Sequence, residues 1–112
     1  MTNKDLANLI FPDIKETIED IEKKYPKRNL PEGAKVTRFA PSPTGFMHIG
    51  NFQQAVTDYI LARKSNGVFY VRNEDTDQSR LKEGAVELIL ETLNYYNIKP
   101  DEYQDGEKIV GN

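Results

Sequence analysis

The chain has 112 residues, of which 38% are hydrophobic and 29% are charged, and this length fits one small domain. Its apolar runs are only a few residues long, which excludes a membrane-spanning helix, and the pattern of a signal peptide is missing. Cysteine is absent, so disulfides, thiolate metal ligands and cysteine nucleophiles are excluded. We therefore expect a cytoplasmic domain that makes no membrane contact.

The net charge of −3 is unevenly distributed. Residues 1–34 and 81–112 carry −1 and −4, whereas residues 35–80 carry +2. A domain that grips a nucleic-acid backbone by itself usually shows a clear basic excess. A polynucleotide partner would therefore need surfaces beyond this chain.

The first segment has the apolar spacing of a helix. Six aliphatic residues recur at steps of three or four: Leu6, Leu9, Ile10, Ile14, Ile18 and Ile21. Pro12 predicts a break near Phe11. Lys23 and Lys24 suit a helix C-terminus, and the proline two residues later ends the segment. We expect residues 1–34 to form a helical leader and linker that pack or cap without chemistry.

The remainder alternates between strand and helix patterns. Residues 35–40 predict a strand, residues 48–66 a helix with Gly67 as its left-handed C′ residue, and residues 68–71 a strand covered on both faces. A second helical stripe comprises Leu81, Ala85, Leu88, Ile89 and Leu93. Residues 108–110 suit a third, short strand. This order is typical of an α/β fold with a partial parallel sheet and helical crossovers over residues 35–112.

Ligands of parallel sheets bind beyond the carboxyl ends of the strands, which places the chemistry just after Ala40 and just after Val71. The first loop feeds into a helix N-terminus, where unpaired N–H groups favour phosphate. Its polar donors and its glycines suit a phosphate ligand: Ser42, Thr44, Gly45, His48, Gly50 and Asn51. Taken singly, each also suits a turn, a cap or the surface, and it is their combination at one sheet edge that favours a site.

The second loop holds three carboxylates between two arginines. Glu74, Asp75 and Asp77 lie between Arg72 and Arg80. Such a cluster suits an ammonium group, a ribose or a metal, whereas a purely structural interpretation makes Asp77 or a neighbour the cap of the next helix.

These two loops resemble a known family. His48-Ile-Gly-Asn51 resembles the HIGH signature of class I aminoacyl-tRNA synthetases, and residues 38–50 closely resemble the version in bacterial glutamyl-tRNA synthetases. The segment from Arg72 to Asp77 resembles the R-x-E-D-T-D element of glutamyl- and glutaminyl-tRNA synthetases. Asn51, Gln53 and Asn73 depart from the family pattern, and the first two supply no positive charge to a phosphate. The resemblance implies a Rossmann-like nucleotide-binding fold.

The resemblance also implies roles for individual residues. Glutamate would be bound by Arg38, Ala40, Ser42, Glu74 and Arg80. ATP would be bound by Thr44, Gly45, His48 and Gly50, with His48, Gly50 and Asn51 forming the catalytic signature. Asp75 and Asp77 would fix the loop and cap the helix.

The implied reaction is the ATP-dependent activation of glutamate and its transfer to the acceptor end of tRNA(Glu). ATP with Mg²⁺ is the implied co-substrate, and no protein-bound metal is expected. The family's second nucleotide loop, acceptor-stem insertion and anticodon domain do not follow Tyr103. We therefore expect an N-terminal fragment that is monomeric and does not charge tRNA usefully alone.

Three alternatives stay open. A glutamyl-queuosine tRNA(Asp) synthetase shares these motifs but usually lacks a helical leader. A small nucleotidylyltransferase shares the H-x-G-H loop but not the acidic cluster of residues 74–77. A non-catalytic interaction module would instead use the apolar stripe of residues 6–21 to bind a partner.

Overall fold

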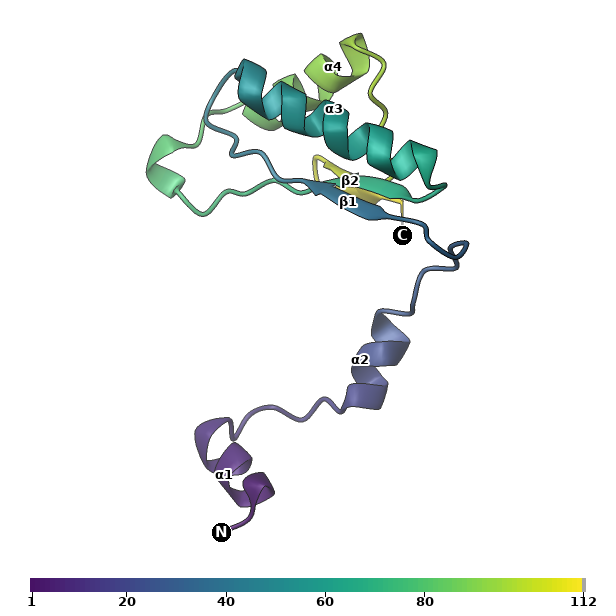
Figure 1. Cartoon of the computed structure of the whole chain (residues 1–112). Helices are drawn as coiled ribbons and strands as arrows, with labels where there is room; N and C mark the ends of the chain where they lie inside the picture. Colours follow the sequence, from purple (N-terminus) through teal and green to yellow (C-terminus); the bar gives the residue numbers. More distant parts are fainter. Residues whose placement is uncertain (112) are drawn as a thin grey trace.

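A computed structural model describes residues 1–111, and these form an α/β body and a separate helical leader (Figure 1). Strands β1 (Val36–Phe39) and β2 (Val68–Val71) pair in parallel, with Val36 opposite Val68 and Phe39 opposite Val71. Helix α3 (Ile49–Lys64) connects them, and α4 (Ala85–Tyr95) lies beside α3 on the same face of the sheet (Figure 1). The predicted α/β class with a short parallel sheet is confirmed, and both strands lie within one residue of their expected bounds.

The core lies between this sheet and the two helices. Its largest fully buried side chains are Phe39, Phe69, Ile89 and Leu93. Ala55 and Ala62 present the buried side of α3, where small side chains let the helix approach the strands closely. The prediction that β2 is covered on both faces is only half right. Phe69 and Val71 are buried beneath the helices, but the side chains that alternate with them stay half-buried, because none of the described helices covers the opposite face.

Helix α3 ends at Lys64, two residues before the predicted end, and the left-handed residue that follows it also differs from the prediction. Asn66, not Gly67, adopts the left-handed conformation, with φ of 52°. The N–H of Gly67 donates to the carbonyl of Ala62 at 2.8 Å and that of Asn66 to Arg63 at 3.3 Å, which together form a Schellman motif. Gly67 is required for a different reason. A Cβ atom there would lie 1.9 Å from the carbonyl oxygen of Lys35, at the start of β1.

The second predicted helical stripe begins later than expected. A 3₁₀ turn (Gln78–Arg80) forms the end of the second loop, and Leu81 lies in extended backbone before α4 begins. Gly84 precedes the helix with φ of 75°. The remaining members of the stripe do face the core, since Ala85, Ile89 and Leu93 are buried and Leu88 is half-buried.

The predicted strand at residues 108–110 is present as β4 (Lys108–Val110), but it is not part of the parallel sheet. It forms an antiparallel hairpin with β3 (Tyr103–Asp105), which the apolar pattern did not reveal. The hairpin is joined to β2 by backbone hydrogen bonds: the N–H of Val71 donates to the carbonyl of Glu102 at 2.9 Å. This arrangement fixes the segment after α4 against the sheet.

The side chain of Asp101 also holds the segment after α4 in place. Its Oδ2 accepts hydrogen bonds from the N–H of Phe69 and from Nη1 of Arg63, both at 2.8 Å. Partial burial raises the pKa of Asp101, but these two donors outweigh burial, and the net effect lowers it. Asp101 therefore links β2, the last turn of α3 and the start of the hairpin.

The leader forms two helices, α1 (Asn3–Ile10) and α2 (Ile18–Lys24). Each begins with a threonine whose hydroxyl accepts from a backbone N–H one turn later, in a capping box with an aspartate. The predicted break near Phe11 and the end before Pro26 are confirmed. The expectation that the leader packs or caps is wrong, because neither helix has a buried residue.

The leader instead lies away from the body (Figure 1). The radius of gyration is 18.1 Å, against about 13 Å for a compact chain of this length. Before β1, Arg28 makes a two-point contact with the carboxylate of Glu102, at 3.0 and 2.6 Å, and lies over the ring of Tyr70. No helix within residues 1–111 has the length and apolar character needed to cross a membrane.

Candidate active site

The two loops singled out in the sequence run side by side beyond the ends of the strands. The backbone N–H of Arg72 donates to the carbonyl of Phe39, and that of Glu74 donates to Pro41, each at 2.9 Å. These bonds continue the pairing of β1 and β2 into the irregular backbone that follows. The prediction that both loops meet at one edge of the sheet is therefore confirmed.

Between the loops lies a pocket of about 290 Å³. Its lining includes seven of the predicted site residues: Ala40, Ser42, Thr44, Gly45, His48, Asn51 and Arg80. All but the last come from the first loop and the start of α3, and Arg80 comes from the 3₁₀ turn at the end of the second loop. Residues far apart in the sequence thus converge on one cavity. Arg38, Gly50 and Glu74 are not part of its lining.

The start of α3 is held by Asn51. His48 is the N-cap residue, and its backbone N–H donates to Oδ1 of Asn51 at 3.3 Å. Asn51 therefore stabilises the first turn of the helix, a structural role that accounts for an uncharged side chain at this position. A Cβ atom on Gly50 would have no heavy atom within 4 Å, so the surface above this glycine is open.

Glu74 lies between two arginines. Its Oε1 is 3.3 Å from Nη1 of Arg38 and 3.4 Å from Nε of Arg72. Two cations thus lie beside this carboxylate, whose two oxygens together offer about four acceptor positions and so retain capacity for an ammonium group.

Asp77 holds the second loop in shape. Its Oδ1 accepts from the hydroxyl of Ser79 and its Oδ2 from Nε of Arg80, each at 2.6 Å. These hydrogen bonds, the one from Ser79 above all, lower the pKa of Asp77. The predicted loop-fixing role is therefore present in the structure. The predicted capping of α4 is wrong, because that helix begins only after Gly84 and has no side-chain cap.

Lys82 and Asp58 were not singled out in the sequence, and Asn73 was noted there only as a departure from the family pattern. Lys82 donates its backbone N–H to the carbonyl of Pro43 at 3.1 Å, which brings its side chain to the first loop. Oδ1 of Asn73 and Oδ2 of Asp58 are buried without a hydrogen-bond partner among the described residues. Burial raises the pKa of Asp58. No local pattern marks any of them, since each acquires its environment from a segment remote in sequence.

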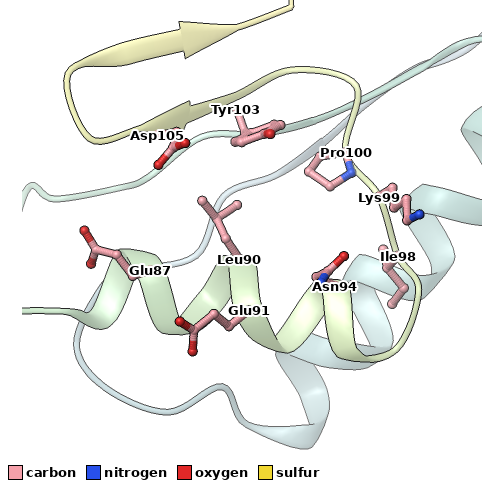
Figure 2. Close-up of a pocket in the computed structure, with 9 residues that line it drawn as sticks. All are labelled: Glu87, Leu90, Glu91, Asn94, Ile98, Lys99, Pro100, Tyr103 and Asp105. Atoms are coloured by element: carbon pink, nitrogen blue, oxygen red, sulfur yellow. The ribbon is translucent and has the colours of Figure 1, made fainter.

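A larger pocket, of about 530 Å³, lies on another part of the body, between α4 and β3 (Figure 2). Leu90 points into it from the helix, and Tyr103 and Pro100 flank it on the hairpin side (Figure 2). Glu87 and Glu91 lie along its helical rim. Negative charge there disfavours a phosphate ligand, and none of the residues expected to bind substrate lines this groove. The smaller pocket at the loops is therefore the candidate active site.

Comparison with known proteins agrees with this geometry. Residues 35–110 match the family described as tRNA synthetases class I (E and Q), catalytic domain. Because this match covers more than half of the chain, the chain belongs to that family of class I synthetases. Its described relatives include glutamate–tRNA ligases in particular.

A glutamate–tRNA ligase from Clostridium perfringens is 50% identical over 107 residues, which are 96% of this chain and 20% of that protein. One from Acetivibrio thermocellus is 52% identical over 105 residues, or 91% of this chain and 19% of that protein. The crystal structure of a glutamate-tRNA synthetase from Elizabethkingia anophelis superposes with a TM-score of 0.61 at 43% identity, covering 62% of this chain and 14% of that one. The chain thus spans about a fifth of the length of these curated relatives.

Proposed function

We propose that this chain forms the part of a glutamate–tRNA ligase that binds ATP and glutamate for the first step of aminoacylation. In that step the α-carboxylate of glutamate attacks the α-phosphate of ATP, which gives glutamyl-adenylate and releases pyrophosphate. The glutamyl group then passes to the 3′ adenosine of tRNA(Glu). The observation that carries the proposal is the convergence of His48, Thr44 and Arg80 on one pocket beyond the ends of β1 and β2.

The first loop and the start of α3 suit the nucleotide. The helix N-terminus at His48 presents unpaired N–H groups and a partial positive charge toward phosphate. Gly50 leaves open space above the first turn, so that a phosphate could approach the backbone closely. Such a site works by positioning and by stabilising charge, and it needs no nucleophile from the protein.

The second loop suits the amino acid. The carboxylate of Glu74 would accept the ammonium group of glutamate, while Arg38 and Arg80 offer planar guanidinium groups for its carboxylates. Both arginines are already oriented by a carboxylate, since Arg38 contacts Glu74 and Arg80 contacts Asp77. Together with Arg80, which lines the pocket, the Arg38–Glu74 pair outside its lining would supply the mixed charge that suits a ligand with one positive and two negative groups.

Mg²⁺ would enter as part of the substrate, bound to the phosphates of ATP. Within residues 1–111 no group of three or more histidine, aspartate or glutamate side chains could hold a metal ion. We further propose residues 35–112 as the catalytic segment and residues 1–34 as its leader.

The test is titration of the ¹⁵N-labelled chain with MgATP and with L-glutamate, followed by NMR. ATP should shift the amides of Thr44 to Asn51, and glutamate those around Arg38 and Glu74. Glu74→Gln should weaken glutamate binding about tenfold, an effect of about 1.4 kcal/mol. Glu107→Gln, an exposed carboxylate in the hairpin turn, is the matched control and should bind like the parent chain. Shifts confined to the groove of Figure 2, or no shifts with either ligand, would contradict the proposal.

A further inference from the structure

Positive charge is unevenly placed around the proposed nucleotide pocket. No lysine or arginine occurs between Arg38 and Arg63, so the first loop and most of α3 carry no permanent cation. A triphosphate bound there must therefore be neutralised by its Mg²⁺, by the helix N-terminus and by cations from another segment. The second loop and the residues that follow it are the adjacent source.

The arginines of the second loop are already engaged. Arg72 contacts Glu74, and Arg80 contacts Asp77 at 2.6 Å. Arg38, at the end of β1, also contacts Glu74. Each of these cations would have to share its charge between a carboxylate of the protein and the ligand.

Lys82 is different. Within residues 1–111 its side chain forms no ion pair. Its backbone N–H bond to Pro43 anchors residue 82 to the first loop. Its Nζ lies 3.7 Å from the point where a Cβ atom on Gly45 would stand, so the ammonium group lies against the Thr44–Gly45 turn. Gly45 has φ of 140°, a conformation that L side chains rarely adopt, which keeps this approach free of a side chain.

We propose that Lys82 binds the phosphates of the nucleotide at the Thr44–Gly45 turn, and that it supplies the permanent charge that the first loop lacks. The inference rests on the proposed function, because it assumes a nucleotide in this pocket. Lys82 itself lines a neighbouring cavity of about 240 Å³ together with Pro43, on the second-loop side of the turn. A lysine side chain has a flexible four-carbon stem, so its ammonium group can follow a phosphate across the rim without moving the backbone.

The test compares Lys82→Gln, Lys82→Arg and the parent chain by calorimetric titration with MgATP and with adenosine. Lys82→Gln should raise the Kd for MgATP about fivefold, in the upper range for one exposed charge contact, and leave the Kd for adenosine unchanged. Lys82→Arg keeps the charge and should stay within about twofold of the parent. The difference between parent and Lys82→Gln should shrink in about 0.5 M salt, where exposed charges are screened.

Lys64→Gln is the matched control. Lys64 is exposed in the last turn of α3, at the opposite end of that helix from His48, and its loss changes the net charge by the same amount. Unchanged MgATP binding by Lys82→Gln would overturn the inference and leave the proposed function standing. Equal weakening of MgATP and adenosine would also overturn it, because a phosphate contact cannot affect adenosine. Absence of MgATP binding by the parent chain would overturn both proposals together.

Discussion

Nε of Arg80 lies 2.6 Å from Oδ2 of Asp77, so an arginine that lines the candidate pocket is oriented by a carboxylate outside its lining. We predict that Asp77→Asn weakens glutamate binding severalfold, because the amide cannot hold the guanidinium by charge. The melting temperature should stay close to that of the parent, since Asp77 is exposed. NMR titration with glutamate measures the first effect and circular dichroism the second. Asp13→Asn, in the leader, should change neither, and equal binding by both variants would argue against a positioning role.

Gly50→Ala should change ligand binding without lowering the stability of the fold. The new Cβ would meet no atom within 4 Å, and alanine favours helix over glycine by up to about 1 kcal/mol. We expect the melting temperature to be unchanged or slightly higher. MgATP binding should weaken about tenfold, because the methyl group would occupy the open surface above the first turn of α3. Normal MgATP affinity in this variant would place the phosphates elsewhere.

Gly67→Ala, in contrast to Gly50→Ala, should lower the stability of the fold. Its Cβ would lie 1.9 Å from the carbonyl oxygen of Lys35, and backbone atoms on both segments would have to move. We predict a loss of roughly 1–3 kcal/mol in the free energy of unfolding, the usual range for overpacking. Chemical denaturation measures this loss, with Gly50→Ala as the matched substitution. Equal stability of the two variants would mean that β1 does not approach the end of α3 this closely.

Asp101→Asn should destabilise the body in a pH-dependent way. The pKa of Asp101 in the folded state is lowered from 3.8, so the ionised group stabilises the fold above pH 3.8. This contribution is lost as the pH falls through the lowered pKa. At pH 7 the variant should have a free energy of unfolding about 1 kcal/mol lower than that of the parent. The effect is no larger because the carboxylate is 38% exposed and solvent screens its interactions.

The measurement for Asp101→Asn is the melting temperature between pH 7 and pH 2. The gap between parent and variant should narrow below pH 3.8 and nearly close at the acid end. Asp105→Asn, in β3, is the control and should melt like the parent at each pH. A gap that widened on acidification would contradict the lowered pKa.

Local signals made three features predictable: the strands β1 and β2, the helix α3 that connects them, and the meeting of the two loops. Prolines and glycines mark the ends of β1 and α3, and the carboxyl ends of parallel strands necessarily share an edge. Other features depend on contacts between remote segments. The close approach of Lys35 to Gly67, the turn of Lys82 toward Pro43 and the separation of the leader from the body leave no mark in hydrophobic spacing. The short strand β3 also went unpredicted, because Tyr-Gln-Asp has no apolar alternation.

The hydrogen bonds that Arg72 and Glu74 donate across to the first loop belong to the same ladder as the strands. Assembly of the site and association of β1 with β2 are therefore one cooperative event. A slip of one residue between these strands would move Arg72 and Glu74 out of register with the carbonyls of Phe39 and Pro41 and so disrupt the pocket. By thermodynamic linkage, a molecule that bridges both loops must also raise the temperature at which the two strands separate.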